Sequence, residues 1–145
     1  MRTLIIIPVL LFSLLLVAPS YSGDYKKFKK GMTAAQNGDW ETALKGWKPL
    51  AKEGNALAQY NLGLMYRYGW GVLPDSKEAV RLWRLSADQG YVDAQYNLGA
   101  IYEQGKIVTQ DYKEAVRWWQ LAAEQGFVKA QYNLGHMYRL SLIHI

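Results

Sequence analysis

The chain has 145 residues, which allows one domain, and half of them are hydrophobic, which is enough for a substantial core. It contains no cysteine, so disulfides, a thiolate nucleophile and a zinc site built on thiols are excluded. The net charge of +5 is modest, and four lysines within residues 26–30 supply much of it. We interpret these lysines as a solvated helix face; the alternative is contact with an anionic surface.

Residues 1–22 have the layout of a secretory signal peptide: a positive start, a short apolar run and then small residues. The apolar run over residues 4–17 is shorter than the roughly 20 residues that span a bilayer. Cleavage is expected after Ser20 or Ser22. We therefore expect a periplasmic or secreted mature protein with no membrane contact after signal cleavage. An uncleaved N-terminal anchor is the alternative.

Residues 23–57 are predicted to form a diverged first helical repeat. We expect its first helix over residues 24–37. Asp39 should open its second helix, because it aligns with Asp75 of the next repeat at an offset of 36 residues. Pro49 lies inside this second helix and should kink it.

Two consecutive copies of one 36-residue unit follow, at residues 58–93 and 94–129. Aligned without gaps, they agree at 21 of 36 positions. A third copy starts over residues 130–139. We interpret residues 140–145 as a non-native tail on a C-terminally truncated chain; a natural apolar tail is the alternative. A fixed period in this range indicates a stacked-repeat architecture, which usually binds other molecules and rarely performs chemistry.

The first helix of each copy is predicted from an apolar stripe at i, i+4, i+7 and i+8. In copy one this stripe is Ala58, Leu62, Met65 and Tyr66. Gly69 should close the helix. A glycine also recurs in mid-helix, where it costs roughly 1 kcal/mol relative to alanine. These glycines are Gly63, Gly99 and Gly135. We expect close helix crossings there, with Ala79 or Ala115 facing the glycines.

The second helix of each copy is predicted to begin at an aspartate N-cap, Asp75 in copy one and Asp111 in copy two. A glutamate follows three residues later, so each pair should form a reciprocal capping box. Gly90 and Gly126 should end these helices. Trp83 and its counterpart in copy two should fill the wider part of the gap between the paired helices.

The repeated positions carry a resemblance to a known family. In copy one they are Ala58, Leu62, Gly63, Tyr66, Gly69, Gly71, Val72, Asp75, Ala79, Trp83, Ala87 and Gly90. Copy two departs at Ile107, where a loop glycine is expected, so its loop should differ. Residues 24–139 resemble the Sel1-like repeat family, a relative of the tetratricopeptide repeats. The resemblance implies an all-α fold, a right-handed α/α superhelical solenoid of antiparallel helix pairs, in an exported bacterial protein that binds or scaffolds others.

A ligand is expected on the concave side of such a stack, where the first helix of each pair is presented. The predicted groove residues are Tyr60, Asn61, Leu64 and Arg67, then Tyr96, Asn97, Ala100 and Glu103, and then Tyr132, Asn133, His136 and Arg139. A row of asparagine amides could clamp the backbone of an extended peptide, since each amide offers two donors and an acceptor. The alternative is that each asparagine bonds a neighbouring helix and orders the stack. The residues that vary between copies should determine specificity.

Catalysis is not expected. The recurring aspartates Asp39, Asp75 and Asp111 begin helices, so capping explains them. His136 is the one histidine outside the suspect tail, which is too few for a metal site or a catalytic triad. We predict a protein or peptide partner, no cofactor, no metal and no nucleic acid. The alternative function is a structural or accessory component of an envelope enzyme or secretion complex.

Overall fold

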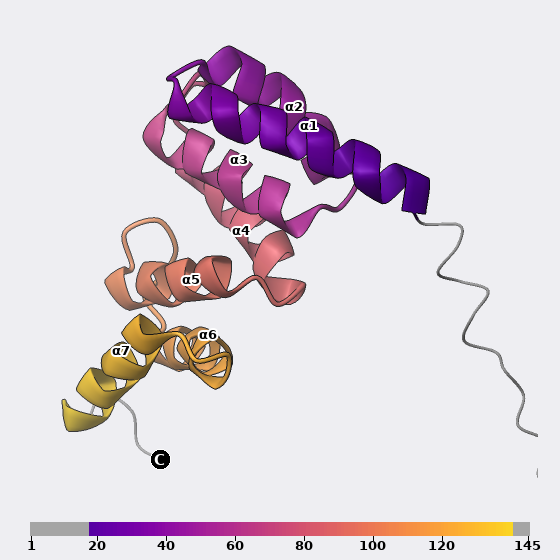
Figure 1. The fold of residues 1–145 in the computed structure, drawn as a ribbon. Helices are drawn as coiled ribbons and strands as arrows, with labels where there is room; N and C mark the ends of the chain where they lie inside the picture. The colour runs from indigo at the N-terminus through magenta and orange to yellow at the C-terminus, as the bar shows by residue number, and fades with distance from the viewer. Residues whose placement is uncertain (1–17, 141–145) are drawn as a thin grey trace, which may run out of the picture.

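The computed structural model describes residues 18–140, which fold into seven α-helices without a strand (Figure 1). The helices are α1 (Ala18–Gln36), α2 (Trp40–Lys52), α3 (Ala56–Tyr68), α4 (Ser76–Asp88), α5 (Val92–Gln104), α6 (Tyr112–Glu124) and α7 (Val128–Arg139). Most of the predicted signal segment and the tail beyond Leu140 lie outside the described residues. Among the helices of residues 18–140, none combines the length and the hydropathy that crossing a bilayer requires.

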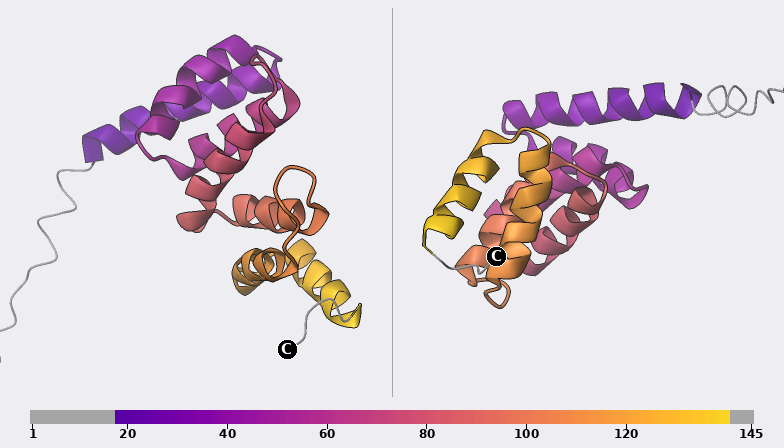
Figure 2. Two further views of the ribbon diagram at one scale, coloured as in Figure 1. Left: turned by 180° about the vertical axis from the view of Figure 1, so that it is seen from behind. Right: turned by 90° about the horizontal axis from the view of Figure 1, so that it is seen from below.

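The helices form a stack in which each one packs on the next along the chain. The closest packing joins α1 with α2, α3 with α4 and α5 with α6, and the intervening helices link these pairs. Figures 1 and 2 show the order running from α1 at one end of the stack to α7 at the other. The predicted all-α solenoid of helix pairs is therefore confirmed.

A tryptophan of each second helix lies against the mid-helix glycine of its pair. A Cβ atom added at Gly63 would lie 2.5 Å from Nε1 of Trp83. Ala79 and Ala115 were expected to face these glycines, but the atoms nearest to Gly63 and Gly99 belong to Trp83 and Trp119. Each indole N–H donates to the carbonyl three residues before the glycine. The three bonds are Trp47 to Phe28 (3.3 Å), Trp83 to Tyr60 (3.1 Å) and Trp119 to Tyr96 (3.1 Å).

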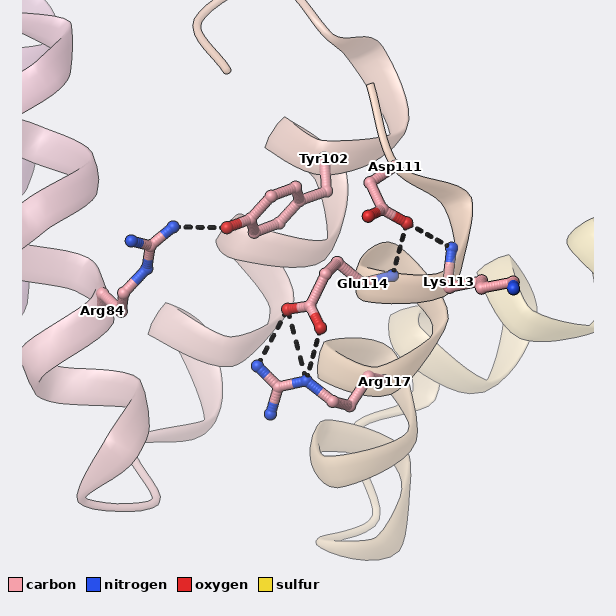
Figure 3. A network of polar contacts seen from close by, with 6 residues as sticks. All are labelled: Arg84, Tyr102, Asp111, Lys113, Glu114 and Arg117. Atoms are coloured by element: carbon pink, nitrogen blue, oxygen red, sulfur yellow. Dashed lines mark hydrogen bonds and ion pairs between the residues drawn. The ribbon is translucent and has the colours of Figure 1, made fainter. Parts of the chain in front are cut away.

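The second helices begin at the predicted aspartates. The Asp111 carboxylate accepts from the backbone N–H groups of Lys113 (2.9 Å) and Glu114 (3.1 Å), as Figure 3 shows. The predicted return bond from the glutamate was wrong. The Glu114 carboxylate instead pairs with Arg117 at 2.9 Å, and the Asp111 N–H donates to the Tyr102 carbonyl at 3.0 Å. The same contacts recur at α4, so the cap also ties each second helix to its first helix.

The predicted terminal glycines end the helices. Gly69 and Gly105 have φ values of 73° and 65°, in the left-handed region, and follow α3 and α5 directly. The Gly69 N–H donates to the Met65 carbonyl at 2.8 Å. Gly90 and Gly126 lie just beyond α4 and α6 with φ values of 89° and 83°. Glycine adopts this region without the Cβ clash that penalises other residues.

The first repeat differs from its prediction in length. The first helix α1 begins at Ala18, six residues before the predicted start at residue 24. The second helix α2 continues through Pro49 and ends at Lys52. Its N-cap is Asp39, whose carboxylate accepts from the Thr42 N–H at 3.0 Å, as predicted.

A ladder of glutamine side chains joins successive repeats, and the sequence analysis did not predict it. Gln59 is buried in α3 and donates through Nε2 to the Ala51 carbonyl at the end of α2, at 3.1 Å. Its own Oε1 accepts from Nε2 of Gln89, the residue after α4, at 2.8 Å. Gln95 and Gln125 repeat both bonds one repeat later, at 3.2 and 2.8 Å. The buried amides of Gln59 and Gln95 therefore each link the end of one second helix to the residue that follows the next second helix.

Candidate functional site

The first helices present the residues predicted to line a groove, and these residues differ in exposure. Tyr132 on α7 is 74% exposed, whereas its counterparts Tyr60 and Tyr96 are half-buried. Tyr60 packs on Tyr91 with ring centroids 4.9 Å apart, and Tyr96 packs on Phe127 at 5.1 Å. In the two inner repeats the tyrosine ring therefore covers the start of the next first helix.

The asparagine series occupies two environments. Asn61 is half-buried, and its Nδ2 donates to the Leu57 carbonyl of its own helix at 2.7 Å. Asn97 is also half-buried and lies near the Tyr60 phenol of the preceding repeat, where it lowers the pKa of that phenol. This position between repeats is the one that the alternative interpretation expects. Asn61 keeps its carbonyl oxygen and one N–H at the surface of its helix.

Burial raises the pKa values of two tyrosines at the repeat boundary. Burial raises the pKa of Tyr60, nearby Asp93 adds to this, and Asn97 opposes it. Burial also raises the pKa of Tyr91 to about 12, with Asp93 again contributing. Both phenols are therefore neutral at physiological pH and serve as packing and hydrogen-bonding groups.

A hollow lies on the face formed by the first helices, and we call it the aromatic hollow. Its volume is about 220 Å³. Among its lining residues are Met32, Trp40, Trp47, Asn61, Leu64 and Trp70. Two residues of the predicted groove, Asn61 and Leu64, thus meet three tryptophans from other elements. The hollow is mainly apolar, with the Asn61 amide among its polar groups.

The tryptophan walls of the aromatic hollow were missed by the sequence analysis. Trp40 begins α2, Trp70 lies in the loop after α3, and their rings stack with centroids 4.8 Å apart. Tyr68 continues this stack on the other side of Trp70 at 5.0 Å. The sequence does contain a signal for this wall. Trp70 lies between two loop glycines, at a position where copy two has Lys106, so an aromatic residue there is specific to copy one.

Glycine lets the loop after α3 lie against Trp40. Gly71 has a φ of 68°, and a Cβ atom added there would lie 2.6 Å from the Cβ of Trp40. The equivalent Ile107 of copy two packs into the core beside α5. The two loops therefore pack on different elements, as the missing glycine predicted, and only the first one helps to form the aromatic hollow.

The variable residues of the predicted groove are dispersed. Arg67 lies over the Tyr68 ring at 5.9 Å and is exposed. Ala100 packs against the core between α6 and α7, which includes Trp119 and Met137, and Glu103 is half-buried. On α7, a shallow hollow of about 280 Å³ is lined by Gln131, Tyr132, Gly135, His136 and Arg139. The structure thus groups the α7 residues together but separates them from the aromatic hollow.

The recurring aspartates act as helix caps in the described part of the chain. Asp39, Asp75 and Asp111 each accept backbone N–H groups at a helix start. Within residues 18–140, no three side chains of histidine, aspartate or glutamate are grouped to hold a metal ion. What the described surface offers is a hollow for an apolar side chain next to an amide.

A family model for the Sel1 repeat matches three consecutive segments, residues 56–91, 92–127 and 128–142. Together these segments cover more than half of the 145 residues. The chain belongs to the Sel1 repeat family. Each matched Sel1 repeat starts where a first helix starts, at Ala56, Val92 and Val128. Sel1 repeats generally mediate protein–protein interactions, so the solenoid is an interaction scaffold in its general type.

Two solved structures share the fold. A Sel1 repeat protein from Oxalobacter formigenes is 31% identical with a TM-score of 0.72, covering 76% of this chain and 45% of that one. A protective antigen present in uropathogenic Escherichia coli strains, which displays an SLR fold, is 31% identical with a TM-score of 0.74. The match covers 83% of this chain and 27% of the antigen. The chain thus spans less than half the length of either neighbour. A comparison with curated proteins gave no match.

Proposed function

We propose that this Sel1 repeat protein is exported and binds a peptide segment of a partner protein on the face formed by its first helices. The observation that carries the proposal is the aromatic hollow, in which Trp40 and Trp70 form walls beside Asn61. Buried aromatic anchors dominate the energetics of protein interfaces. The family's general role as an interaction scaffold supports the same reading.

Recognition would combine one apolar side chain with the peptide backbone. The side chain would enter the hollow against Leu64 and the tryptophan rings. The free N–H and the carbonyl oxygen of Asn61 would bond the peptide backbone, as an amide that offers both a donor and an acceptor can. Selectivity among peptides would come from Arg67, because it is exposed and changes to Glu103 in the next repeat.

An affinity pull-down from a cell-envelope extract tests this proposal. The double variant Asn61→Ala/Trp70→Ala removes two lining side chains that lie outside the buried core. Loss of an aromatic anchor typically weakens an interface about tenfold or more, so the partner should disappear from the eluate. The control Lys113→Ala changes an exposed residue of α6 and should recover the partner as the parent chain does.

Equal recovery of every partner by the double variant and the parent chain would contradict the proposal, provided that both melt at the same temperature. Export is tested separately by mass spectrometry of the N-terminus. We expect mature chains that start at Tyr21 or Gly23 in the periplasmic or secreted fraction. An intact N-terminus in a membrane fraction would favour the anchored alternative.

A further inference from the structure

A second and larger groove lies on the face formed by the second helices. Its volume is about 900 Å³. α2 and α4 form its walls and α3 forms its floor. The floor carries Leu62 of α3, and the α4 wall carries Leu82 and Leu85 together with the Glu78–Arg81 ion pair. Leu85 is 41% exposed, so this α2–α4 groove presents apolar surface to a partner.

The comparison of repeats explains why the groove is open. Leu82 occupies the position that Trp118 occupies one repeat later. Trp118 is 2% exposed and packs in one core cluster with Val80 and Trp83 of α4. The smaller leucine leaves unfilled the space between α2 and α4 that an indole fills between α4 and α6. The groove is therefore a feature of this repeat boundary and is not a general property of the stack.

Lysines line the α2 wall of the groove. Lys45, Lys48 and Lys52 occur at i, i+3 and i+7, so they follow one edge of the helix over about 10 Å. Lys45 pairs with Glu41 at 2.7 Å. Lys48 and Lys52 are exposed, and within residues 18–140 no carboxylate lies within ion-pair distance of either. This wall thus carries positive charge that the chain itself does not neutralise.

We propose that the α2–α4 groove binds an acidic amphipathic helix of a partner protein. The apolar face of that helix lies on the exposed Leu85 and Pro49, with the buried Leu62 and Leu82 closing the bottom of the groove, as amphipathic helices lie in apolar grooves. Its carboxylates follow Lys48 and Lys52, since acidic residues four positions apart, one turn along the helix, match their spacing. Exposed ion pairs add little affinity, so covering the exposed apolar surface of Leu85 and Pro49 supplies most of the binding energy. The lysines select the sign of the partner's charge.

Fluorescence anisotropy with the full chain tests this inference. The probe is a labelled peptide of about 15 residues, with leucines on one helical face and glutamates on the other. We expect this acidic peptide to bind, and to bind more weakly as salt is raised. A peptide with lysine in place of every glutamate, and an acidic peptide with the leucines scattered around the helix, should not bind. Equal binding of either control peptide overturns the inference.

Two variants locate the binding. Leu82→Trp fills the groove with the side chain that the next repeat carries at this position. It should weaken binding of the acidic peptide about tenfold or more. Lys48→Glu/Lys52→Glu reverses the charge of two exposed residues and should weaken it similarly, while Lys113→Glu, the same change on α6, should not. Unchanged binding of the acidic peptide by the Lys48→Glu/Lys52→Glu variant overturns the inference. If Leu82→Trp destabilises the fold, the lysine variant alone serves as the test. Asn61→Ala should bind normally, which separates this groove from the aromatic hollow.

Discussion

The contact between Trp83 and Gly63 sets how closely α3 and α4 approach. The indole is buried and held by its bond to the Tyr60 carbonyl, so it has little room to move. Gly63→Ala would place a methyl group 2.5 Å from Nε1. Overpacking of this kind costs about 1–3 kcal/mol, which outweighs the gain of about 1 kcal/mol in helix propensity. We expect a lower free energy of unfolding, measured by urea titration followed by circular dichroism.

The control for this substitution is in the same chain. Gly135 is the equivalent glycine of α7, and a Cβ atom added there meets nothing within 4 Å in the described structure. Gly135→Ala should therefore gain helix propensity and leave stability unchanged or raised by up to about 1 kcal/mol. If both substitutions had the same effect, the indole contact could not be the reason for the glycine.

At the scale of helices, the glutamine ladder is what joins one repeat to the next. Gln95 is buried and bonds both the Ala87 carbonyl and the Gln125 amide. Gln95→Leu is similar in size but removes both bonds, while the Ala87 carbonyl keeps the Gly90 N–H and Gln125 keeps the Gly90 carbonyl. A hydrogen bond contributes about 0.5–1.5 kcal/mol, so we expect a drop in the free energy of unfolding.

Gln131 provides the comparison for this prediction. It makes the equivalent bond to the Ala123 carbonyl at 3.3 Å, but it is exposed on α7. Water can replace that bond, so Gln131→Leu should cost much less than Gln95→Leu in the same urea titration. Equal costs for the two variants would show that the ladder does not couple the repeats.

Local signals in the sequence were enough to predict the helices, and contacts between repeats were not. Asp111 was predicted as an N-cap and Gly69 as a helix end because each acts on its own backbone. The glutamine ladder and the indole bonds join positions 8 to 30 residues apart, and no periodicity of one helix reveals them. The start of α1 at Ala18 was missed because its sequence was interpreted as a cleavage region.

For the candidate site too, the sequence predicted the residues on one helix and missed those brought in from other elements. Asn61 and Leu64 were predicted as groove residues from their position on the first helix, and both line the aromatic hollow. Trp40 and Trp70 were missed because they lie outside the helix that carries the repeat pattern, 30 residues apart. A stack brings such residues together only through the loop conformation that Gly71 permits.

For the molecule as a whole, a stack of repeats offers two independent surfaces. Each helix packs on its neighbours along the chain, so stability is expected to spread along the stack from one repeat to the next. The aromatic hollow opens on the face of the first helices and the α2–α4 groove on the face of the second helices. The lining residues of the two sites do not overlap, so the two proposals together predict that one partner does not displace the other.

The central claim is that the two helices of each repeat are held together by an indole bonded to the backbone of the first helix. Hydrogen exchange of the indole N–H groups, followed by ¹H–¹⁵N spectra in D₂O and assigned with tryptophan-to-phenylalanine variants, tests it most directly. Trp47, Trp83 and Trp119 are buried and bonded, so their signals should persist long after that of Trp70, which is 37% exposed. Loss of all four signals at one common rate would contradict the account.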